Sequence, residues 1–316
     1  MAIEFQTFSI VAGNAYCNAS CYFCVSKMTT SPERAMEISN PQKNVDWRNF
    51  EKAAILAQMS KATTVLITGK GEPTMFPDEI TAYLKALQPY RFPIIELQTN
   101  GTLFQNKKLY GNHDHLQDWY KNGLNTVAIS VVGINPEQNR KIYLPKEPEY
   151  PSLEKTVEML HDNGFLVRLG VVGLRDHIDT PERLEELVEY CKKHSIEQLT
   201  WRPVNKTEYT HDPNVNKRIE ENQIPDPQVG AIKEYVKTHG TPLQELVHGG
   251  MVYDLHNQNL CLTHSLTHDP DINVIRSLIF YSTGETTYSW DHPGAIILPK
   301  SPEARKREKE LLKHRK

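Results

Sequence analysis

Three cysteines lie close together near the start of the chain. Cys17, Cys21 and Cys24 have the spacing C-x3-C-x2-C. Three thiolates on one loop can bind three corners of a cubane iron–sulfur cluster, and the fourth iron then stays open to a small molecule. Phe23, directly before the last cysteine, would shield such a cluster from water. The motif therefore predicts an iron–sulfur centre with these three cysteines as ligands.

Two other interpretations of the cysteines stay open, a structural zinc site and a chance group of inert thiols. Structural zinc usually takes four protein ligands in paired knuckles. The other two cysteines, Cys191 and Cys261, have no Cys or His knuckle partner nearby in the sequence. A disulfide framework explains five cysteines poorly, because the N-terminus lacks the basic and apolar regions of a signal peptide. The alternative function is a non-enzymatic iron–sulfur or zinc-binding module.

Strand and helix signals alternate over the first two thirds of the chain. Helices are predicted over residues 46–61, 77–87, 116–122, 153–162 and 181–194. Strands are predicted over residues 5–11, 64–68, 94–98, 126–132, 166–172 and 198–204. Such alternation predicts an α/β fold with a parallel sheet, here a partial (βα)6 TIM-like barrel. The chemistry of such sheets lies at the C-terminal ends of the strands, and the cysteines directly follow the first strand.

The cysteine spacing, the aromatic residue before the last cysteine and the (βα)6 pattern resemble the radical S-adenosylmethionine (SAM) superfamily over roughly residues 5–205. Within it, the chain resembles the molybdenum-cofactor-biosynthesis/SPASM-like branch without the auxiliary-cluster cysteines. The resemblance implies one 4Fe-4S cluster whose open iron binds SAM. It implies cleavage of SAM to a 5′-deoxyadenosyl radical, which abstracts hydrogen from a substrate. It also implies an oxygen-sensitive cytoplasmic enzyme with a flavodoxin or ferredoxin as reductant.

Segments at the ends of later strands match SAM-binding positions of that family. The sequence GKGEPT at residues 69–74 is similar to the family's Gly-Gly-Glu-Pro segment, which contacts the SAM amino group, although Lys70 replaces the usual small residue. Glycines let backbone carbonyls approach an ammonium group, and a proline stiffens the turn. Two non-functional interpretations stay open: residues 69–74 can form a surface turn without a ligand, and the Ser130 hydroxyl can be bonded within the sheet. The resemblance implies cofactor contacts from Gly71, Glu72, Pro73, Asn100 and Ser130.

Two arginines complete the predicted cofactor site. Arg168 lies on the fifth predicted strand and is expected to pair with the SAM carboxylate, because a guanidinium fork suits a carboxylate. Arg202 ends the sixth strand beside Trp201. It is expected to contact adenine or substrate, with a packing role at the barrel rim as the alternative.

Residues 1–205 are predicted to form the core barrel and residues 206–316 a C-terminal extension. The extension is expected to contain a polar linker, a helix, a β-hairpin and a basic helical tail, at residues 206–228, 229–239, 274–290 and 302–316. Some relatives carry a cysteine for an auxiliary cluster after such a hairpin. Ser289 and Trp290 stand at that place, so no auxiliary cluster is predicted.

Composition limits the class of protein. The chain has 316 residues, a formal charge of −3 and 39% hydrophobic residues, which excludes a mainly disordered chain and a globally basic nucleic-acid binder. No apolar run has the roughly 20 residues that span a membrane. The tail at 302–316 carries seven basic and three acidic residues. The excess of basic residues can belong to a solvated helix end or to a contact with a nucleotide. The second alternative slightly favours a nucleotide or nucleic-acid substrate over a peptide.

Overall fold

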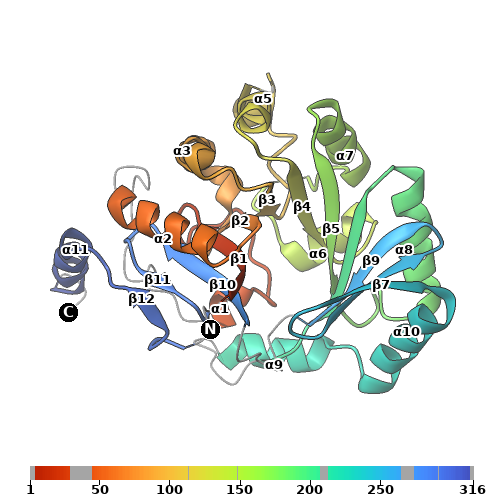
Figure 1. Ribbon diagram of the computed structural model, residues 1–316. Coiled ribbons are helices and arrows are strands. Elements are labelled where there is room, and N and C mark those ends of the chain that lie inside the picture. Colours follow the sequence, from red (N-terminus) through yellow and green to blue (C-terminus); the bar gives the residue numbers. More distant parts are fainter. Residues whose placement is uncertain are drawn as a thin grey trace.

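The structure is a computed structural model that describes residues 4–28, 45–112, 114–147, 149–206, 213–264, 274–290 and 292–313. Six parallel strands lie side by side in sequence order, and helices connect them (Figure 1). They are β1 (Glu4–Val11), β2 (Thr64–Thr68), β3 (Ile94–Thr99), β4 (Thr126–Val131), β5 (Leu166–Gly173) and β6 (Gln198–Pro203). The α/β fold with a partial (βα)6 TIM-like barrel is therefore confirmed.

The long helices of the barrel lie along the outer side of the curved sheet (Figure 1). They are α2 (Trp47–Met59), α3 (Pro77–Leu87), α5 (Asp114–Lys121), α7 (Leu153–Asp162) and α8 (Pro181–Lys193). Each agrees with a predicted helix to within two residues at both ends. Short elements complete the connections: α1 (Val25–Met28), α4 (Lys107–Tyr110), α6 (Pro136–Tyr143), η3 (Pro73–Met75) and η4 (Gln88–Tyr90).

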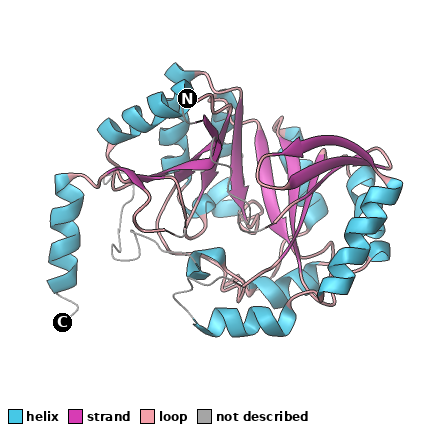
Figure 2. Cartoon of the chain, turned by 60° about the horizontal axis from the view of Figure 1, so that its bottom comes forward, coloured by secondary structure: helices cyan, strands magenta, loops and turns pink. Residues whose placement is uncertain are grey.

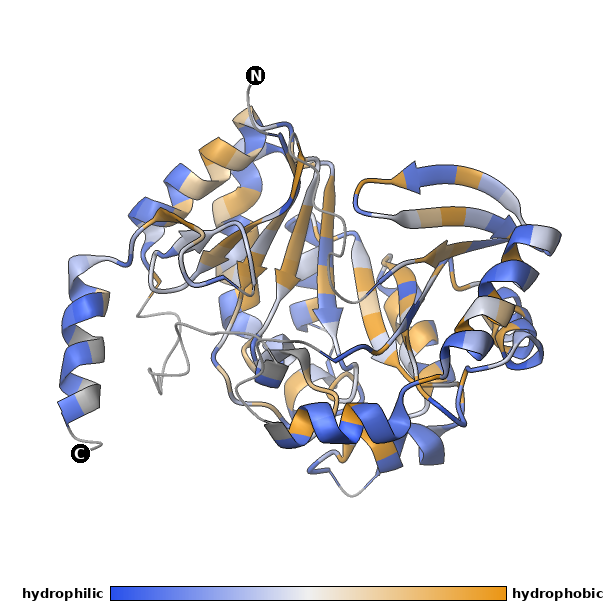
Figure 3. Ribbon diagram, turned by 90° about the horizontal axis from the view of Figure 1, so that it is seen from below, coloured by the Kyte–Doolittle hydropathy of each residue, from blue (hydrophilic) through white to orange (hydrophobic). Residues whose placement is uncertain are grey.

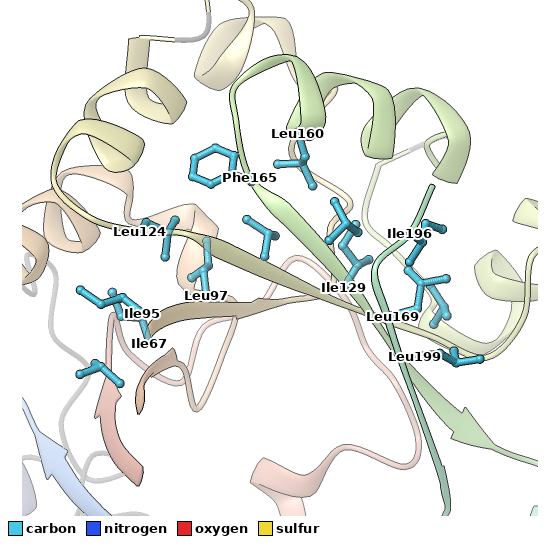
Figure 4. Packing of buried hydrophobic residues seen from close by; sticks show 14 of the residues in the cluster. Ile67, Ile95, Leu97, Leu124, Ile129, Leu160, Phe165, Leu169, Ile196 and Leu199 are labelled. Carbon is cyan, nitrogen blue, oxygen red and sulfur yellow. The ribbon is translucent and has the colours of Figure 1, made fainter. Parts of the chain in front are cut away.

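The hydrophobic core fills the space between the sheet and these helices (Figure 4). In β5 the buried Val167, Leu169 and Val171 alternate with less buried residues, among them Arg168 and Gly170. Because successive side chains of a strand point to opposite faces, the apolar residues meet the helices and the others face the barrel interior. Figure 3 shows hydrophobic stretches concentrated in the strands.

The C-terminal part extends both edges of this sheet. At one edge β9 (Gln258–Leu262) pairs parallel with β6 and continues into antiparallel β8 (Gly250–Leu255) and β7 (Thr241–Leu246). At the other edge β10 (Val274–Tyr281) pairs parallel with β1, followed by β11 (Thr286–Thr287) and β12 (Ile296–Leu298). The predicted hairpin exists as the antiparallel pair of β10 and β11. Its longer strand, however, mainly extends the barrel.

The linker predicted over residues 206–228 is wrong where it covers helix α9 (Pro213–Asn222). Val215 and Ile219 are buried one turn apart, against a cluster that contains Val204 and Leu174. Two apolar residues in a polar segment give too weak a pattern for a helix to be predicted.

The two helices predicted in the extension are present. Helix α10 (Asp226–His239) begins three residues before its predicted start. Helix α11 (Pro302–Lys313) forms the tail and stands apart from the sheet (Figure 2). No helix in the described part of the chain has the length and apolar character needed to cross a membrane.

Candidate active site

The cysteine loop leaves the end of β1 and reaches α1. Its cysteines Cys17, Cys21 and Cys24 are partly buried and free. The pKa of Cys17 is raised to about 11 and that of Cys21 to about 12, mainly by burial and in part by the charge of Cys24. Three thiolates that are buried and repel one another are stabilised when they bind a cation, so the loop suits a metal centre.

A cubane cluster and a single metal ion require different spacings of the cysteine thiols. Among the described residues, no three His, Cys, Asp or Glu side chains are gathered closely enough to hold one metal ion. A zinc ion needs its sulfur ligands at about 2.3 Å from one centre. The three cysteines of a cubane cluster each bind a different iron and therefore lie farther apart.

Asn18 fixes the cysteine loop to the end of β3. Its side chain is buried, with 2% of its surface exposed. The Asn18 Nδ2 donates to Thr102 Oγ1 over 2.7 Å, and the Asn100 Nδ2 donates to Asn18 Oδ1 over 3.0 Å. Asn100 thus supports the loop that carries the predicted ligands. The sequence analysis did not identify Asn18 or Thr102, although Asn18 lies inside the cysteine motif.

Gly71 brings the predicted SAM-binding segment against the start of the cysteine loop. A Cβ atom at this position would lie 1.8 Å from the Tyr16 carbonyl oxygen. The same carbonyl accepts a hydrogen bond from the Glu72 amide over 3.1 Å. Pro73 follows at the start of η3 and is buried. The structure therefore brings Gly71, Glu72 and Pro73 next to the cysteines.

The side chain of Glu72 joins the ends of β2 and β3. It is 3% exposed, and its Oε1 accepts from Thr74 N and Oγ1 over 3.0 and 2.6 Å. Thr99 Oγ1 donates to the same oxygen over 2.6 Å, and the Asn100 amide donates to Oε2 over 2.9 Å. Burial raises the pKa of Glu72, and these four hydrogen bonds oppose that rise. The carboxylate thus supports Asn100, while its predicted contact with the cofactor stays a prediction.

Ser130 reaches the cysteine loop through Tyr143. The Ser130 Oγ and the Tyr143 hydroxyl are 2.8 Å apart, and the Tyr143 carbonyl accepts from the Ser20 amide over 2.9 Å. The Tyr143 ring packs edge-on against Phe23, with 5.6 Å between centroids. Burial raises the pKa of Tyr143 well above its usual value, so its hydroxyl is neutral. Tyr143 is the last residue of α6 and was not predicted as a site residue, because its partners Phe23 and Ser130 lie on other segments.

Lys70, the departure from the family's segment, lies against the C-terminal hairpin. It is 5% exposed, and its Nζ is 5.1 Å from the centroid of the Trp290 ring. Trp290 packs in turn on a small cluster that contains Val11, at the end of β1, and Tyr281. Trp290 occupies the place where an auxiliary-cluster cysteine was considered. The hairpin therefore braces the glycine segment.

Arg168 and Arg202 occupy the inner face of the sheet. The Arg168 Nη2 forms an ion pair with the Glu96 Oε1 of β3. The Arg202 Nη2 lies 4.0 Å from the place that a Cβ atom would take at Gly170. The predicted pairing of Arg168 with the SAM carboxylate stays a prediction, as does the contact of Arg202 with adenine or substrate.

Glu79 of α3 holds the turn in front of the cysteine loop and makes stability depend on pH. Its Oε1 accepts from the Gly13 amide over 3.0 Å, and burial raises its pKa to about 7. The unfolded state, with a pKa of about 4.3, binds fewer protons than the folded state between these values. Stability from this group is therefore fully present below about pH 4 and is lost as the pH rises through about 7, by at most about 4 kcal/mol.

We expect Glu79→Gln to remove this part of the pH dependence, because the amide oxygen still accepts from Gly13 and does not titrate. Denaturant unfolding at several values between pH 5 and 8 measures the effect, with the exposed Glu158→Gln as the control. Equal slopes for wild type and Glu79→Gln would contradict the assignment.

The family model of the Radical SAM superfamily matches residues 14–191, more than half of the chain. No curated protein matches the chain significantly.

Solved structures resemble the chain over most of its length. SuiB of Streptococcus suis bound to S-adenosylmethionine has 15% identity and a TM-score of 0.59, with 96% of this chain and 64% of SuiB covered. SuiB bound to the precursor peptide SuiA has 15% identity and a TM-score of 0.54, with 90% of this chain and 59% of SuiB covered. A radical SAM methyltransferase from Sphaerobacter thermophilus has 14% identity and a TM-score of 0.52, with 81% of this chain and 66% of the methyltransferase covered. The chain thus spans just under two thirds of these proteins, and the likeness is one of fold.

Proposed function

The chain belongs to the radical SAM superfamily, and from this premise we propose that its cysteine loop and strand ends hold the cofactors of a reaction on a substrate in the open barrel. The protein is an enzyme whose cofactors are a 4Fe-4S cluster and SAM. The three cysteines of this loop would hold the cluster, which would supply the electron for reductive cleavage of SAM and thereby the means to abstract a hydrogen atom from the substrate.

The observation that carries the proposal is the convergence of four strand ends on one loop. Cys17, Cys21 and Cys24 would hold the cluster. Tyr16, Asn18 and Ser20 within or beside this loop bond to Glu72, Asn100 and Tyr143, which follow β2, β3 and β4. The predicted SAM-binding segments are thereby fixed relative to the cluster ligands, and such fixed geometry is what the protein contributes to cofactor chemistry.

An external electron donor, a flavodoxin or ferredoxin, is part of the proposal. The cysteines outside the motif do not provide a second cluster motif, because Cys191 is buried in α8 and Cys261 lies in β9. The electron must therefore come from another protein or a chemical reductant.

A nucleotide is the first candidate substrate and a peptide the second. Helix α11 carries five basic and three acidic residues, and arginines line the barrel interior, both of which suit a phosphate-bearing ligand. The peptide candidate rests on the likeness to SuiB, which has been crystallised with its precursor peptide SuiA.

Transfer of deuterium into 5′-deoxyadenosine tests the proposed hydrogen abstraction. The reduced holoenzyme is incubated with SAM and either deuterated ribonucleotides or a deuterated peptide digest, and 5′-deoxyadenosine is analysed by mass spectrometry. We expect deuterium from the nucleotides. Transfer from the peptides alone would contradict the order of the two candidates, and transfer from neither would contradict both.

Tyr143→Phe tests how Ser130 is positioned. The variant keeps the ring that packs on Phe23 and loses the 2.8 Å hydrogen bond to Ser130. We expect a loss of about 1 kcal/mol in unfolding free energy and SAM binding weaker by roughly fivefold, since about 1 kcal/mol corresponds to that factor. Denaturant unfolding and SAM titration measure the two effects. The exposed Tyr120→Phe is the matched control, and equal SAM affinity in both variants would contradict the role of Tyr143.

A further inference from the structure

The inner faces of β4, β5, β6 and β9 bring a guanidinium to the middle of the barrel. Gly170 pairs with Ser130 on one side and Thr200 on the other, and Thr200 pairs with Cys261. Arg202 lies two residues beyond Thr200, about 6.6 Å along the same strand face. Its Nη2 nevertheless lies 4.0 Å from the Cβ position of Gly170, so the side chain turns back into the barrel. A Cβ atom at Gly170 would be in ordinary contact with this guanidinium, and a larger side chain would enter the space beside it.

The guanidinium of Arg202 has no bonded partner in the described part of the chain. No hydrogen bond or ion pair joins it to any of those residues. Arg168, two residues before Gly170, pairs with Glu96 through Nη2, but its Nε is buried without a partner. Arg202 is partly buried and has no bonded counter-ion among the described residues, and burying an unpaired charge is costly, so this arrangement is suited to a charge brought in by a ligand.

Arg276 of β10 is a third arginine whose charge acts on Arg202. Burial lowers the pKa of Arg202, and the charges of Arg168 and Arg276 lower it further. The opposing effects of Tyr143 and Glu96 are smaller. The pKa of Cys261 on β9 is raised by burial and lowered by the charges of the same three arginines.

We propose that Arg168, Arg202 and Arg276, the inner-face arginine cluster, bind a phosphate group of the substrate. A phosphate monoester carries about −1.5 to −2 charges at pH 7 and offers three acceptor oxygens, which suits several guanidinium forks. A single carboxylate needs only one fork. This inference rests on the proposed function and specifies its substrate class.

The position of the cluster fits a substrate role. Ser130 lies beside Gly170 in the sheet and bonds to Tyr143, whose carbonyl accepts from the cysteine loop. A ligand whose phosphate is held over Gly170 therefore extends toward the strand ends where the cofactors are proposed to bind. Such anchoring of a non-reacting group orients the reacting carbon.

Titration with simple anions tests the proposal without the radical reaction. Cluster-loaded, unreduced protein without SAM is titrated calorimetrically with phosphate, pyrophosphate and succinate at constant ionic strength. We expect one saturable site for phosphate and pyrophosphate, with binding weakened at least about tenfold by Arg202→Gln, as for loss of a charge-assisted contact. Arg305→Gln in α11 removes a surface cation and is expected to leave binding unchanged.

Two further measurements keep the test independent of a folding defect. Gly170→Val keeps all three charges but fills the space beside Arg202, and we expect it to weaken pyrophosphate binding as well. In the wild-type protein pyrophosphate should slow alkylation of Cys261, followed by peptide mass spectrometry, and it should not do so in Arg202→Gln.

Four results would overturn the proposal. They are the absence of saturable phosphate binding, equal weakening in Arg305→Gln, tighter binding of succinate than of phosphate, and unchanged binding in both Arg202→Gln and Gly170→Val. Because no reductant or SAM is present, these outcomes are distinguishable from a failure of SAM cleavage.

Discussion

The Cys24→Ala protein is expected to lose its iron–sulfur cluster and, with it, SAM cleavage. The three cysteines of the loop are the ligands proposed for the cluster, and each would hold one iron. Removing one leaves a second iron without a protein ligand. We expect bound iron and sulfide to fall to background, together with the absorbance at about 400 nm. The rate of 5′-deoxyadenosine formation should fall by roughly a hundredfold or more, beyond the range seen when only a supporting residue is lost.

Cys191→Ala is the matched control for this experiment. Cys191 is fully buried in α8, outside the motif. We expect a modest loss of stability, about 1 kcal/mol, from the small cavity, with iron content and SAM cleavage retained. A Cys24→Ala protein with wild-type iron content and activity would contradict the assignment of the ligands.

Gly71→Ala is expected to disrupt the contact between the SAM-binding segment and the cysteine loop. The added Cβ would lie 1.8 Å from the Tyr16 carbonyl oxygen and 2.7 Å from that of Asn14. Both are backbone atoms and cannot rotate away, so the two segments must separate. We expect a loss of about 2–4 kcal/mol in unfolding free energy, in the range of severe steric substitutions. SAM affinity should fall at least about tenfold, since 1.4 kcal/mol already corresponds to that factor.

Gly230→Ala separates this steric effect from the general effect of adding a methyl group. Gly230 lies in α10, and no atom lies within 4 Å of its Cβ position. Alanine in a helix interior is favoured over glycine, so we expect a gain of about 0.5–1 kcal/mol and unchanged SAM affinity. Denaturant unfolding and SAM titration of both variants are the measurements. Equal SAM affinity in Gly71→Ala and wild type would contradict the proposed contact.

The barrel could be predicted because its signals are local. The helix at Pro77–Leu87 and the strand at Thr64–Thr68 repeat apolar residues at their own periods, and the structure reproduces both ranges. The edge strands could not be predicted. The parallel pairing of β10 with β1 joins Thr7 to Ser277, which are 270 residues apart, and only the folded chain shows which edge receives it.

The candidate active site could likewise be predicted only where its residues are neighbours in the sequence. The cysteine spacing and the glycine segment are visible in the sequence because their residues are neighbours. The roles of Glu72 and Arg168 depend on partners from other strands. Glu72 bonds to Asn100, which lies 28 residues away in the sequence. Arg168 pairs with Glu96, which lies 72 residues away. The cofactor contacts of both side chains stay predictions, and the structure adds the bonds that each forms within the protein.

Formation of 5′-deoxyadenosine from SAM is the most direct test of the central claim. The protein is reconstituted with iron and sulfide without oxygen, reduced with dithionite and incubated with SAM. Products are quantified by liquid chromatography and mass spectrometry. We expect equal amounts of methionine and 5′-deoxyadenosine, dependent on the reductant and absent in Cys24→Ala. A reduced, cluster-loaded protein that leaves SAM intact would contradict the claim that this chain cleaves SAM by radical chemistry.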